Sequence, residues 1–429
     1  MAGDGVSPEL RLTAEVRPAG PNLFVRGRLL APKRIGDLLL TLMEVVDARF
    51  FVPGAMLARM LRLADPVVTC GLARVRFEAF SQCCGAYGRV DLLENAMEGE
   101  ILNRGTTNVD FNPPMRAGLA RLSDAGPARI TVGADRVELE SGRAQVVERK
   151  VKLPERWLRG FVEVQAFQAR MQRVFGAGGA ALRRFLHELR SHTGIAYVSA
   201  AGPLIRVTPT EQRGAVAVGG LDRLKVLLRA ARHAESLEVF ADPATGASAW
   251  VIGTPEARFQ YVLSPEPSRG FSGEGQVLET LASAGGNATG AVRAALRWQD
   301  RIDAAELAST GGHDVGDVRR GLAVCAASGL VGFDLADGAY FHRELPFDLS
   351  LIERHQSRLV NARALAAAGA VEFDAEDRAW VTSGEKRYRV WLGAEPRCTC
   401  PWVAKHGTSR GPCKHILTAR QVREREVRA

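Results

Sequence analysis

Four residues near the end of the chain constrain its fold more than any other feature, because their side chains are typical ligands of zinc. They are Cys398, Cys400, Cys413 and His415. Zinc prefers four nitrogen or sulfur ligands in a tetrahedron, and structural sites take all four ligands from the protein. We therefore predict one structural Zn²⁺ that is held by these four side chains.

The residues between the ligands predict how the backbone brings them together. The first two ligands are one residue apart and can face one ion only if the chain turns sharply as it leaves a strand. Pro401 stops the strand there, and Gly411-Pro412 is expected to turn the chain back toward the site. Residues two apart on a helix point to nearly opposite faces, so we expect Cys413 just before a helix and His415 in its first turn.

Other interpretations of the motif are open at this point. The four residues could carry no metal, or Cys398 and Cys400 could form a disulfide. Such a small loop would be strained, and the odd, low count of seven cysteines is typical of a reducing compartment. His406 could replace His415 as the fourth ligand, but its spacing differs. A catalytic zinc is not expected, because it would keep one position open for water.

The spacing Cys-x-Cys, twelve residues, Cys-x-His resembles that of SWIM zinc fingers. The surroundings agree, with a predicted β-hairpin before the motif, Pro-Trp after the second cysteine and an apolar helix start after the histidine. The resemblance covers about residues 371–422 and implies a hairpin-plus-helix module that binds DNA or proteins. The long N-terminal part with this finger also resembles a bacterial family of SWIM proteins. Some of its members are encoded beside MoxR-type AAA+ ATPases and von Willebrand factor A proteins, which implies an adaptor role.

The remainder of the chain predicts an α+β multidomain protein. Its parts are a mixed α/β N-terminal domain at 1–194, a small α/β subdomain at 195–263, a linker at 264–275, a winged-helix-like domain at 276–345 and the SWIM module at 346–429. The linker is inferred from its Pro, Gly and Ser content. Asp303 and Asp314 are expected to cap two helices of the winged helix, and Asp337-Gly338 to form the turn of its wing. Residues 153–189 are expected to be mostly helical.

The charge of the chain permits a nucleic-acid partner. The net charge is +9, and from residue 405 onward there are seven basic residues and two acidic ones. A basic helix beside a structural zinc could contact phosphates, or it could be a solvated terminal helix. The predicted binding residues are Lys405, Arg410, Lys414, Arg420 and Arg423 of the tail, with Arg319 and Arg320 of the winged helix.

The N-terminal half offers an alternative function. Asp91, Asn108, Asp110 and Asn112 lie in or beside apolar strands and could converge on an acid–base site, although turn and strand-end hydrogen bonds are the favoured explanation. The sequence contains no P-loop, dinucleotide fingerprint or hydrolytic metal motif. We therefore expect a non-catalytic, zinc-binding protein that recognises DNA or a partner protein, and an enzyme at Asp91 and Asp110 is the second hypothesis.

The sequence also predicts where the protein resides. Its first residues lack the basic start and apolar stretch of a signal peptide, and no segment approaches about 18 uninterrupted apolar residues. We expect a cytoplasmic protein without a membrane contact.

Overall fold

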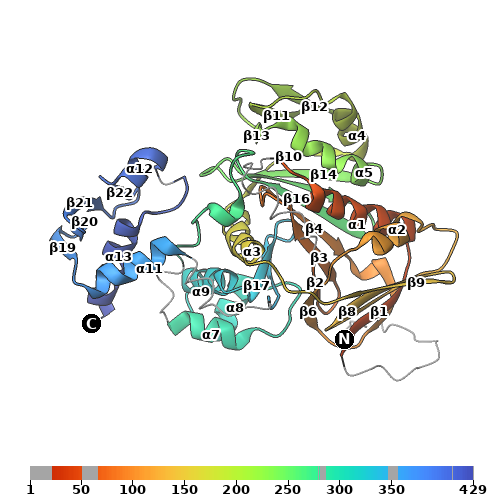
Figure 1. Cartoon of the computed structure of the whole chain (residues 1–429), viewed down its shortest axis with the longest axis horizontal. Helices are drawn as coiled ribbons and strands as arrows, with labels where there is room; N and C mark the ends of the chain where they lie inside the picture. The colour runs from red at the N-terminus through yellow and green to blue at the C-terminus, as the bar shows by residue number, and fades with distance from the viewer. Residues whose placement is uncertain are drawn as a thin grey trace, which may run out of the picture.

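The computed structural model describes residues 22–50, 66–278, 280, 287–345, 356–407 and 409–428. They form a mixed α/β structure, as predicted, around one eight-stranded antiparallel sheet (Figure 1). The sequence pattern also predicts a strand at 10–16 and a helix at 54–63, and both lie outside the described residues.

The eight-stranded sheet has the order β10-β14-β15-β16-β4-β3-β2-β6. Its strands are β2 (Val67–Cys70), β3 (Val75–Phe80), β4 (Ala86–Leu92), β6 (Gly105–Asn108), β10 (Gln172–Gly178), β14 (Ser236–Ala241), β15 (Ser248–Gly253) and β16 (Ala257–Leu263). β16 pairs with β4, and Tyr261 lies opposite Gly88. One sheet therefore joins strands from both sides of the boundary predicted at residue 194. The predicted division into 1–194 and 195–263 would cut through this sheet. The sequence held no signal for this pairing, because the paired residues are far apart along the chain.

Two smaller sheets extend this part of the molecule. The five-stranded sheet β5-β1-β7-β8-β9 contains β1 (Leu23–Leu29), β5 (Met97–Ile101), β7 (Ala128–Gly133), β8 (Arg136–Ser141) and β9 (Ala144–Arg149). The three-stranded sheet β12-β11-β13 contains β11 (Ile195–Ala201), β12 (Leu204–Thr208) and β13 (Val216–Gly219). Short helical segments accompany them: η2 (Glu94–Ala96), α2 (Pro113–Ala120), α4 (Gly179–Glu188), η3 (Leu221–Leu227) and α5 (Leu228–Ala231).

Helices α1 (Pro32–Asp47) and α3 (Glu155–Gln168) cover opposite faces of the large sheet, because neighbouring residues of β4 point to opposite sides. Gly88 faces α1, where a Cβ atom would collide with Leu42. Tyr87 faces α3 and makes an edge contact with Phe161. Residues 153–189 are mostly helical, as predicted, in α3 and α4, but β10 lies between these helices and gains its backbone hydrogen bonds from β14.

Residues 264–275 are packed against the body and do not behave as the predicted linker. Phe271 lies in the short helix η4 (Phe271–Gly273), is fully buried, and contacts the rings of Phe80 and Phe167. Its N–H donates to the carbonyl of Cys84. The Pro, Gly and Ser content of this segment therefore reflects tight turns.

The described residues that follow form three helices and a hairpin, of which the last two helices and the hairpin were predicted. They are α7 (Asn287–Ala295), α8 (Ala304–Gly311), α9 (Val315–Ala327), β17 (Val331–Asp334) and β18 (Ala339–His342). The side chains of Asp303 and Asp314 accept backbone N–H groups at the starts of α8 and α9, which confirms both predicted caps. Gly338 has φ of +59° in the hairpin turn, a conformation that favours glycine.

The C-terminal module lies at one end of the molecule (Figure 1). It contains α11 (Ser357–Ala367), the four-stranded sheet β19 (Val371–Ala375), β20 (Arg378–Ser383), β21 (Lys386–Trp391) and β22 (Arg397–Cys398), and helices α12 (Pro401–His406) and α13 (Lys414–Arg428). Leu417 of α13 shares a buried cluster with Leu359 of α11, Ala327 of α9 and Val162 of α3. One apolar cluster thus joins the module to the rest of the chain. Among the described helices, none is long and apolar enough to cross a membrane.

Candidate metal centre

The four predicted ligands come from three adjoining elements of the C-terminal module. Cys398 ends β22, Cys400 is the N-cap of α12, and Cys413 directly precedes α13. His415 is the second residue of α13. The predicted placement of Cys413 before a helix and of His415 in its first turn is therefore confirmed. Pro401 does end the strand region, and it also occupies the first turn of α12, where a missing N–H costs nothing.

The ligand atoms of these residues all lie within 4.8 Å of one another, and all four side chains are buried. Nδ1 of His415 is 3.7 Å from Sγ of Cys398 and 4.0 Å from Sγ of Cys413. The ring of Tyr388 stacks on the imidazole with a centroid distance of 4.2 Å, and this fixes the ring orientation. Three sulfurs and one imidazole nitrogen thus converge on one small buried volume.

This donor set fits a structural Zn²⁺. Three thiolates so close together would repel one another without a cation between them, and zinc is bound by this combination of sulfur and nitrogen ligands. The N–H of Ile416 lies 3.4 Å from Sγ of Cys413 and supports a thiolate there. Cys398 and Cys400 form no disulfide. His406 does not join the cluster but ends α12 against the ring of Trp402.

A backbone turn beside the metal ligands anchors the finger to the body. This turn, residues 409–412, is hereafter the knuckle. Nη1 of Arg358 donates to the carbonyls of Arg410 and Pro412 at 2.9 and 3.0 Å, and the guanidinium lies over the ring of Trp402. Gly411 has φ of +74°, and a Cβ there would collide with the carbonyl of Gly275. The turn predicted at Gly411-Pro412 is therefore present, and glycine is required there for two reasons.

The partner of the knuckle is the segment that had been expected to be a linker, together with Gln276, which directly follows it. Arg269 and Gln276 both donate to the carbonyl of Ser409, at 2.9 and 3.0 Å. Arg269 also forms a bidentate pair with the buried carboxylate of Glu274, and Arg410 lies 3.7 Å from the same group. These contacts mean that the shape of the metal site and the docking of the finger depend on one another.

Glu163 of α3 lies behind this contact. Its Oε2 accepts the N–H groups of Gln276 and Val277 at 2.8 and 3.4 Å. Burial raises the pKa of Glu163 to about 8, with nearby Glu274 adding to the rise and the N–H groups opposing it. The carboxyl group is therefore held in an apolar setting that favours its protonated form.

The predicted tail residues do not form one free basic surface. Residues 415–419 are buried, since α13 packs on α11 and on the finger sheet. Arg423 pairs with Glu376 at 3.4 Å, and Arg410 is held in the knuckle contact. Lys405 is exposed, whereas Lys414 and Arg420 are half-buried. The start of α13 after His415 is thus interior, while Arg420 and Arg423 are half-buried and Arg425 is exposed.

Arg319 and Arg320 lie in a different part of the molecule, on α9. Both are exposed, and Arg320 pairs with Asp317 on the same helix. The structure therefore places these two residues and the tail residues on separate units.

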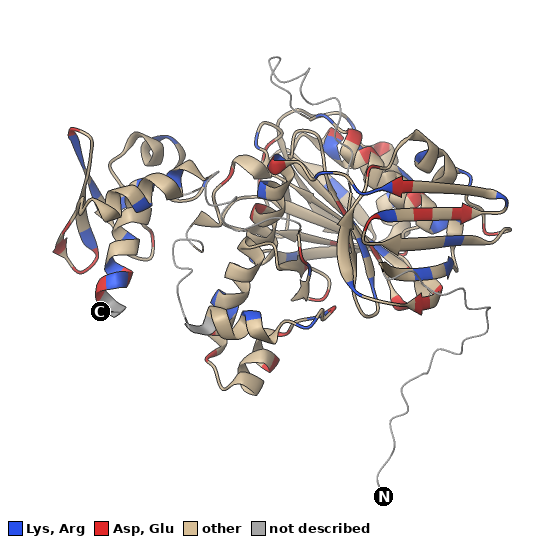
Figure 2. Ribbon diagram, turned by 60° about the horizontal axis from the view of Figure 1, so that its bottom comes forward, with Lys and Arg blue, Asp and Glu red and all other residues tan. Residues whose placement is uncertain are grey.

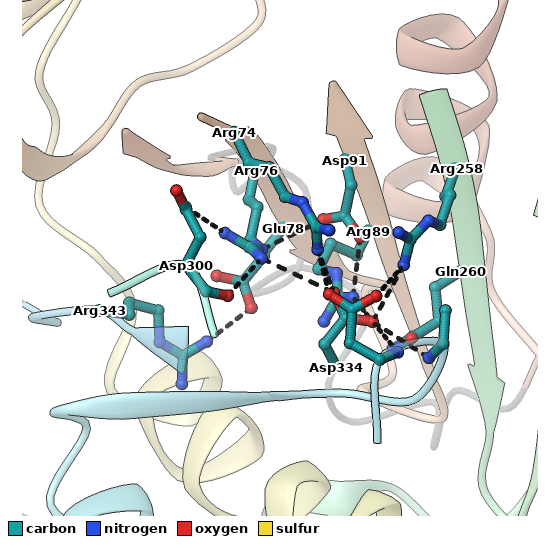
Figure 3. A network of polar contacts seen from close by, with 12 residues as sticks. Arg74, Arg76, Glu78, Arg89, Asp91, Arg258, Gln260, Asp300, Asp334 and Arg343 are labelled. Atoms are coloured by element: carbon teal, nitrogen blue, oxygen red, sulfur yellow. Dashed lines mark hydrogen bonds and ion pairs between the residues drawn. The ribbon is translucent and has the colours of Figure 1, made fainter. Parts of the chain in front are cut away.

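A buried ionic network joins the large sheet to the hairpin β17–β18 (Figure 3). Asp334 of the hairpin lies 3.1 Å from Arg89 and 3.6 Å from Arg76, and all three side chains are 1% exposed. Burial would raise the pKa of Asp334, but Arg89, Arg76, Arg258 and Arg74 outweigh it and hold that pKa well below its usual range. The turn of the hairpin is thus fixed to the sheet by charge.

Asp91 belongs to this network. It lies 2.8 Å from Arg89 and 3.5 Å from Arg76, and burial together with Asp334 raises its pKa. Asp110 follows β6, three strands away from β4 in the sheet, which is roughly 14 Å at the usual strand spacing. Asn112 donates to Glu148, and Asn108 to the carbonyl of Val151. The structure therefore separates Asp91 from Asp110, whereas the hydrogen bonds of Asn108 and Asn112 agree with the favoured explanation of turn and strand-end contacts.

Sequence reasoning missed the network because Arg76 and Glu78 alternate with apolar residues along β3. That alternation is typical of a strand with one solvated face. Here the hairpin and α3 cover the charged face. The feature of the sequence that could have indicated this is the acidic pair Asp334 and Asp337 in the hairpin, which matches the arginines of the sheet.

Comparison with known proteins identifies the finger. Residues 388–421 match the family model of the SWIM zinc finger. No curated protein matches the chain.

Several solved sliding clamps are weakly similar in structure. Proliferating Cellular Nuclear Antigen from Entamoeba histolytica is 9% identical over 57% of this chain and 99% of its own, with a TM-score of 0.39. The PCNA of A. fulgidus, with the C-terminal region of FEN-1, is 12% identical over 56% of this chain and 98% of its own (TM-score 0.37). The PCNA2-PCNA3 complex from Sulfolobus tokodaii is 8% identical over 56% of this chain and 99% of its own (TM-score 0.39). Similarity at this level carries no inference about function.

Proposed function

We propose that this chain is a non-catalytic, cytoplasmic binding protein whose C-terminal SWIM finger recognises nucleic acid or a partner protein. The observation that carries the proposal is the metal site, where four buried protein ligands lie close together, which is the number that a structural zinc takes from the protein. An ion held in this way gives shape to the module and offers no position to a substrate. The module also protrudes from one end of the molecule, where a partner can reach it (Figure 1).

We further infer that α7 to β18 form a winged-helix-like domain whose wing serves internal packing. Asp334 and Asp337 of the wing bind Arg74 and Arg258 of the body, so this turn is not available to a DNA backbone. Any contact of this unit with nucleic acid would use α9, through Arg319 and Arg320. We therefore assign the main binding role to the finger.

The zinc assignment is tested by metal content of the purified full chain. Cys398→Ser and Cys413→Ser should each abolish stoichiometric zinc and lower the melting temperature, because structural zinc contributes folding energy directly. His406→Ala is the matched control, since it lies in the finger outside the ligand cluster, and it should retain one zinc per chain. Full zinc content in both cysteine variants would refute the site.

The binding role is tested with the same zinc-loaded chain. Binding to DNA that weakens steeply with rising salt supports the nucleic-acid branch. Capture of a protein partner that survives nuclease treatment supports the protein branch, and the bacterial SWIM resemblance makes an AAA+ ATPase or a von Willebrand factor A protein the class to examine. If neither occurs, the proposal fails.

A further inference from the structure

The sheet of the finger has two faces of different chemistry. Its inner face packs on α13 and the metal ligands through Ala379, Val381, Val390 and Cys398, all of which are buried. Its outer face carries Arg378, Trp380, Arg387, Arg389, Trp391 and Arg397, together with Thr382 opposite Arg387 and Glu372 opposite Trp380. Figure 1 places α11 and α13 between β19–β21 and the body, so the outer face points away from the rest of the molecule.

The strand register interleaves the two tryptophans with the arginines. Trp380 lies opposite Arg389, and Trp391 lies opposite Arg378 on one side and Arg397 on the other. The guanidinium of Arg389 lies 5.4 Å from the ring centres of both Trp380 and Trp391. The two tryptophans are diagonal neighbours, and strand geometry places their Cα atoms about 7–8 Å apart. Two separate aromatic rings therefore sit in one field of positive charge.

The acids near this face neutralise only part of that charge. Glu372 pairs with Arg387 at 2.6 Å, Asp374 pairs with Arg378 at 2.8 Å and with Arg389 at 3.7 Å, and Glu395 pairs with Arg397 at 3.5 Å. Three acids thus face four arginines. The side chains of Arg387 and Glu372 are 50% and 72% exposed, and exposed pairs of this kind contribute little stability. The arginines can therefore exchange these partners for the phosphates of a bound strand. Figure 2 shows basic residues along the strands of this hairpin.

We propose that the outer face of the finger sheet binds single-stranded nucleic acid, with one base stacked on each tryptophan and the phosphates on the surrounding arginines. This inference rests on the proposed binding function and names its ligand. Aromatic rings among arginines suit single strands, because unpaired bases can lie flat on a side chain, whereas bases inside a duplex cannot. A flat sheet face is also unsuited to reading a duplex, since the major groove takes a protruding helix or a ribbon.

The test uses the zinc-loaded full chain and a labelled mixed-sequence DNA strand of about 20 nucleotides, in fluorescence anisotropy at low salt. The native chain should bind this strand more tightly than the same sequence as a duplex. Trp380→Leu and Trp391→Leu should each weaken binding of the single strand roughly 5- to 100-fold, since a stacked base contributes that much affinity. Trp380→Phe and Trp391→Phe retain a ring and should recover most of the loss.

Two controls separate this face from general charge and from loss of fold. Arg397→Ser removes an exposed arginine of the face and should weaken binding, whereas Arg320→Ser removes a comparably exposed arginine of α9 and should not. Each variant should retain one zinc per chain, which shows that the finger is intact.

The outcomes distinguish this inference from the proposed function. Strand binding that is unchanged in both Trp→Leu variants, or a preference for duplex, overturns the inference and leaves a nucleic-acid-binding protein. If the chain binds no nucleic acid, the inference fails and only the protein branch survives. If polyglutamate binds with the same dependence on Trp380 and Trp391, the face recognises acidic polypeptide, and the inference is likewise overturned.

Discussion

At the residue scale, the buried carboxyl group of Glu163 shows how one side chain links the body to the finger. It accepts two N–H groups at the end of the segment that contacts the knuckle, those of Gln276 and Val277. Its pKa of about 8 is well above that of an exposed glutamate. Between about pH 4.5 and pH 8 the folded state therefore holds a proton that the unfolded chain has already released.

This difference predicts a pH dependence with a defined sign. A raised folded-state pKa gives a stabilising contribution that is complete below the unfolded pKa and is lost as pH rises through the folded one. The unfolding free energy of the native chain should therefore fall relative to that of Glu163→Gln, by on the order of 3–5 kcal/mol between about pH 5 and pH 8.5. Urea unfolding at both pH values measures it.

Glu94→Gln provides the matched control, because Glu94 is exposed. This variant should follow the native chain at both pH values, and changes in zinc affinity with pH are common to all three proteins and cancel in the comparison. Parallel behaviour of Glu163→Gln and the native chain would contradict a protonated Glu163.

The metal ligands are the residues that the sequence predicts best. Their spacing is local, and Pro401 and Gly411 predict the turns that the site requires. The contacts of Arg358 with the carbonyls of the knuckle could not be predicted, because a guanidinium that binds backbone oxygens leaves no complementary residue type in the sequence.

At the scale of elements, the hairpin β17–β18 is attached to the sheet by the ionic network. Asp334 meets arginines of β3, β4 and β16, which are far from it in the chain. Caps, turns and strand patterns of the hairpin were predictable because each depends on neighbouring residues. The docking was not, because the arginines that bind Asp334 lie roughly 75–250 residues earlier in sequence, and no local rule connects them.

Asp334→Asn should destabilise this docking. The change leaves Arg76 and Arg89 buried with too little negative charge, so we expect a loss of about 3 kcal/mol in unfolding free energy. Hydrogen exchange of β17, β18 and α9 should become faster as the hairpin separates from the sheet more often. The low pKa of Asp334 means that its contribution is present at neutral pH and is lost only in strong acid, as pH falls through the folded-state value.

Asp317→Asn is the control for this prediction. It removes one partner of an exposed ion pair on α9, where we expect a change of roughly 0.5 kcal/mol or less. Equal losses of unfolding free energy in both variants would show that burial of the network does not increase its contribution to stability.

At the scale of the whole molecule, the described units are joined by two interfaces of different chemistry. The hairpin interface is ionic, whereas the finger interface combines the apolar cluster around Leu417 with the polar knuckle contact. The boundary predicted at 194 and the linker at 264–275 both failed for the same reason: composition and local pattern describe segments, whereas the sheet and the finger contact are made between segments.

Removal of zinc should therefore be felt beyond the finger. With a strong chelator, hydrogen exchange should become faster in α12 and α13 and also in residues 269–278, because Arg269 and Gln276 lose the carbonyl of Ser409. Strands β14 and β15 of the large sheet should keep their protection from exchange. A response confined to the finger would contradict mechanical coupling through the knuckle.

The apolar cluster that contains Val162 and Leu417 has a consequence for biosynthesis. A ribosome makes Val162 some two hundred and fifty residues before Leu417, so the surface of α3 that Leu417 later covers is exposed during much of translation. The cluster is complete only after Leu417, which follows the last ligand His415, has emerged, and we expect a captured metal to help hold Leu417 in place. The supply of zinc in the cell would then affect how long each new chain exposes this apolar surface to chaperones and proteases.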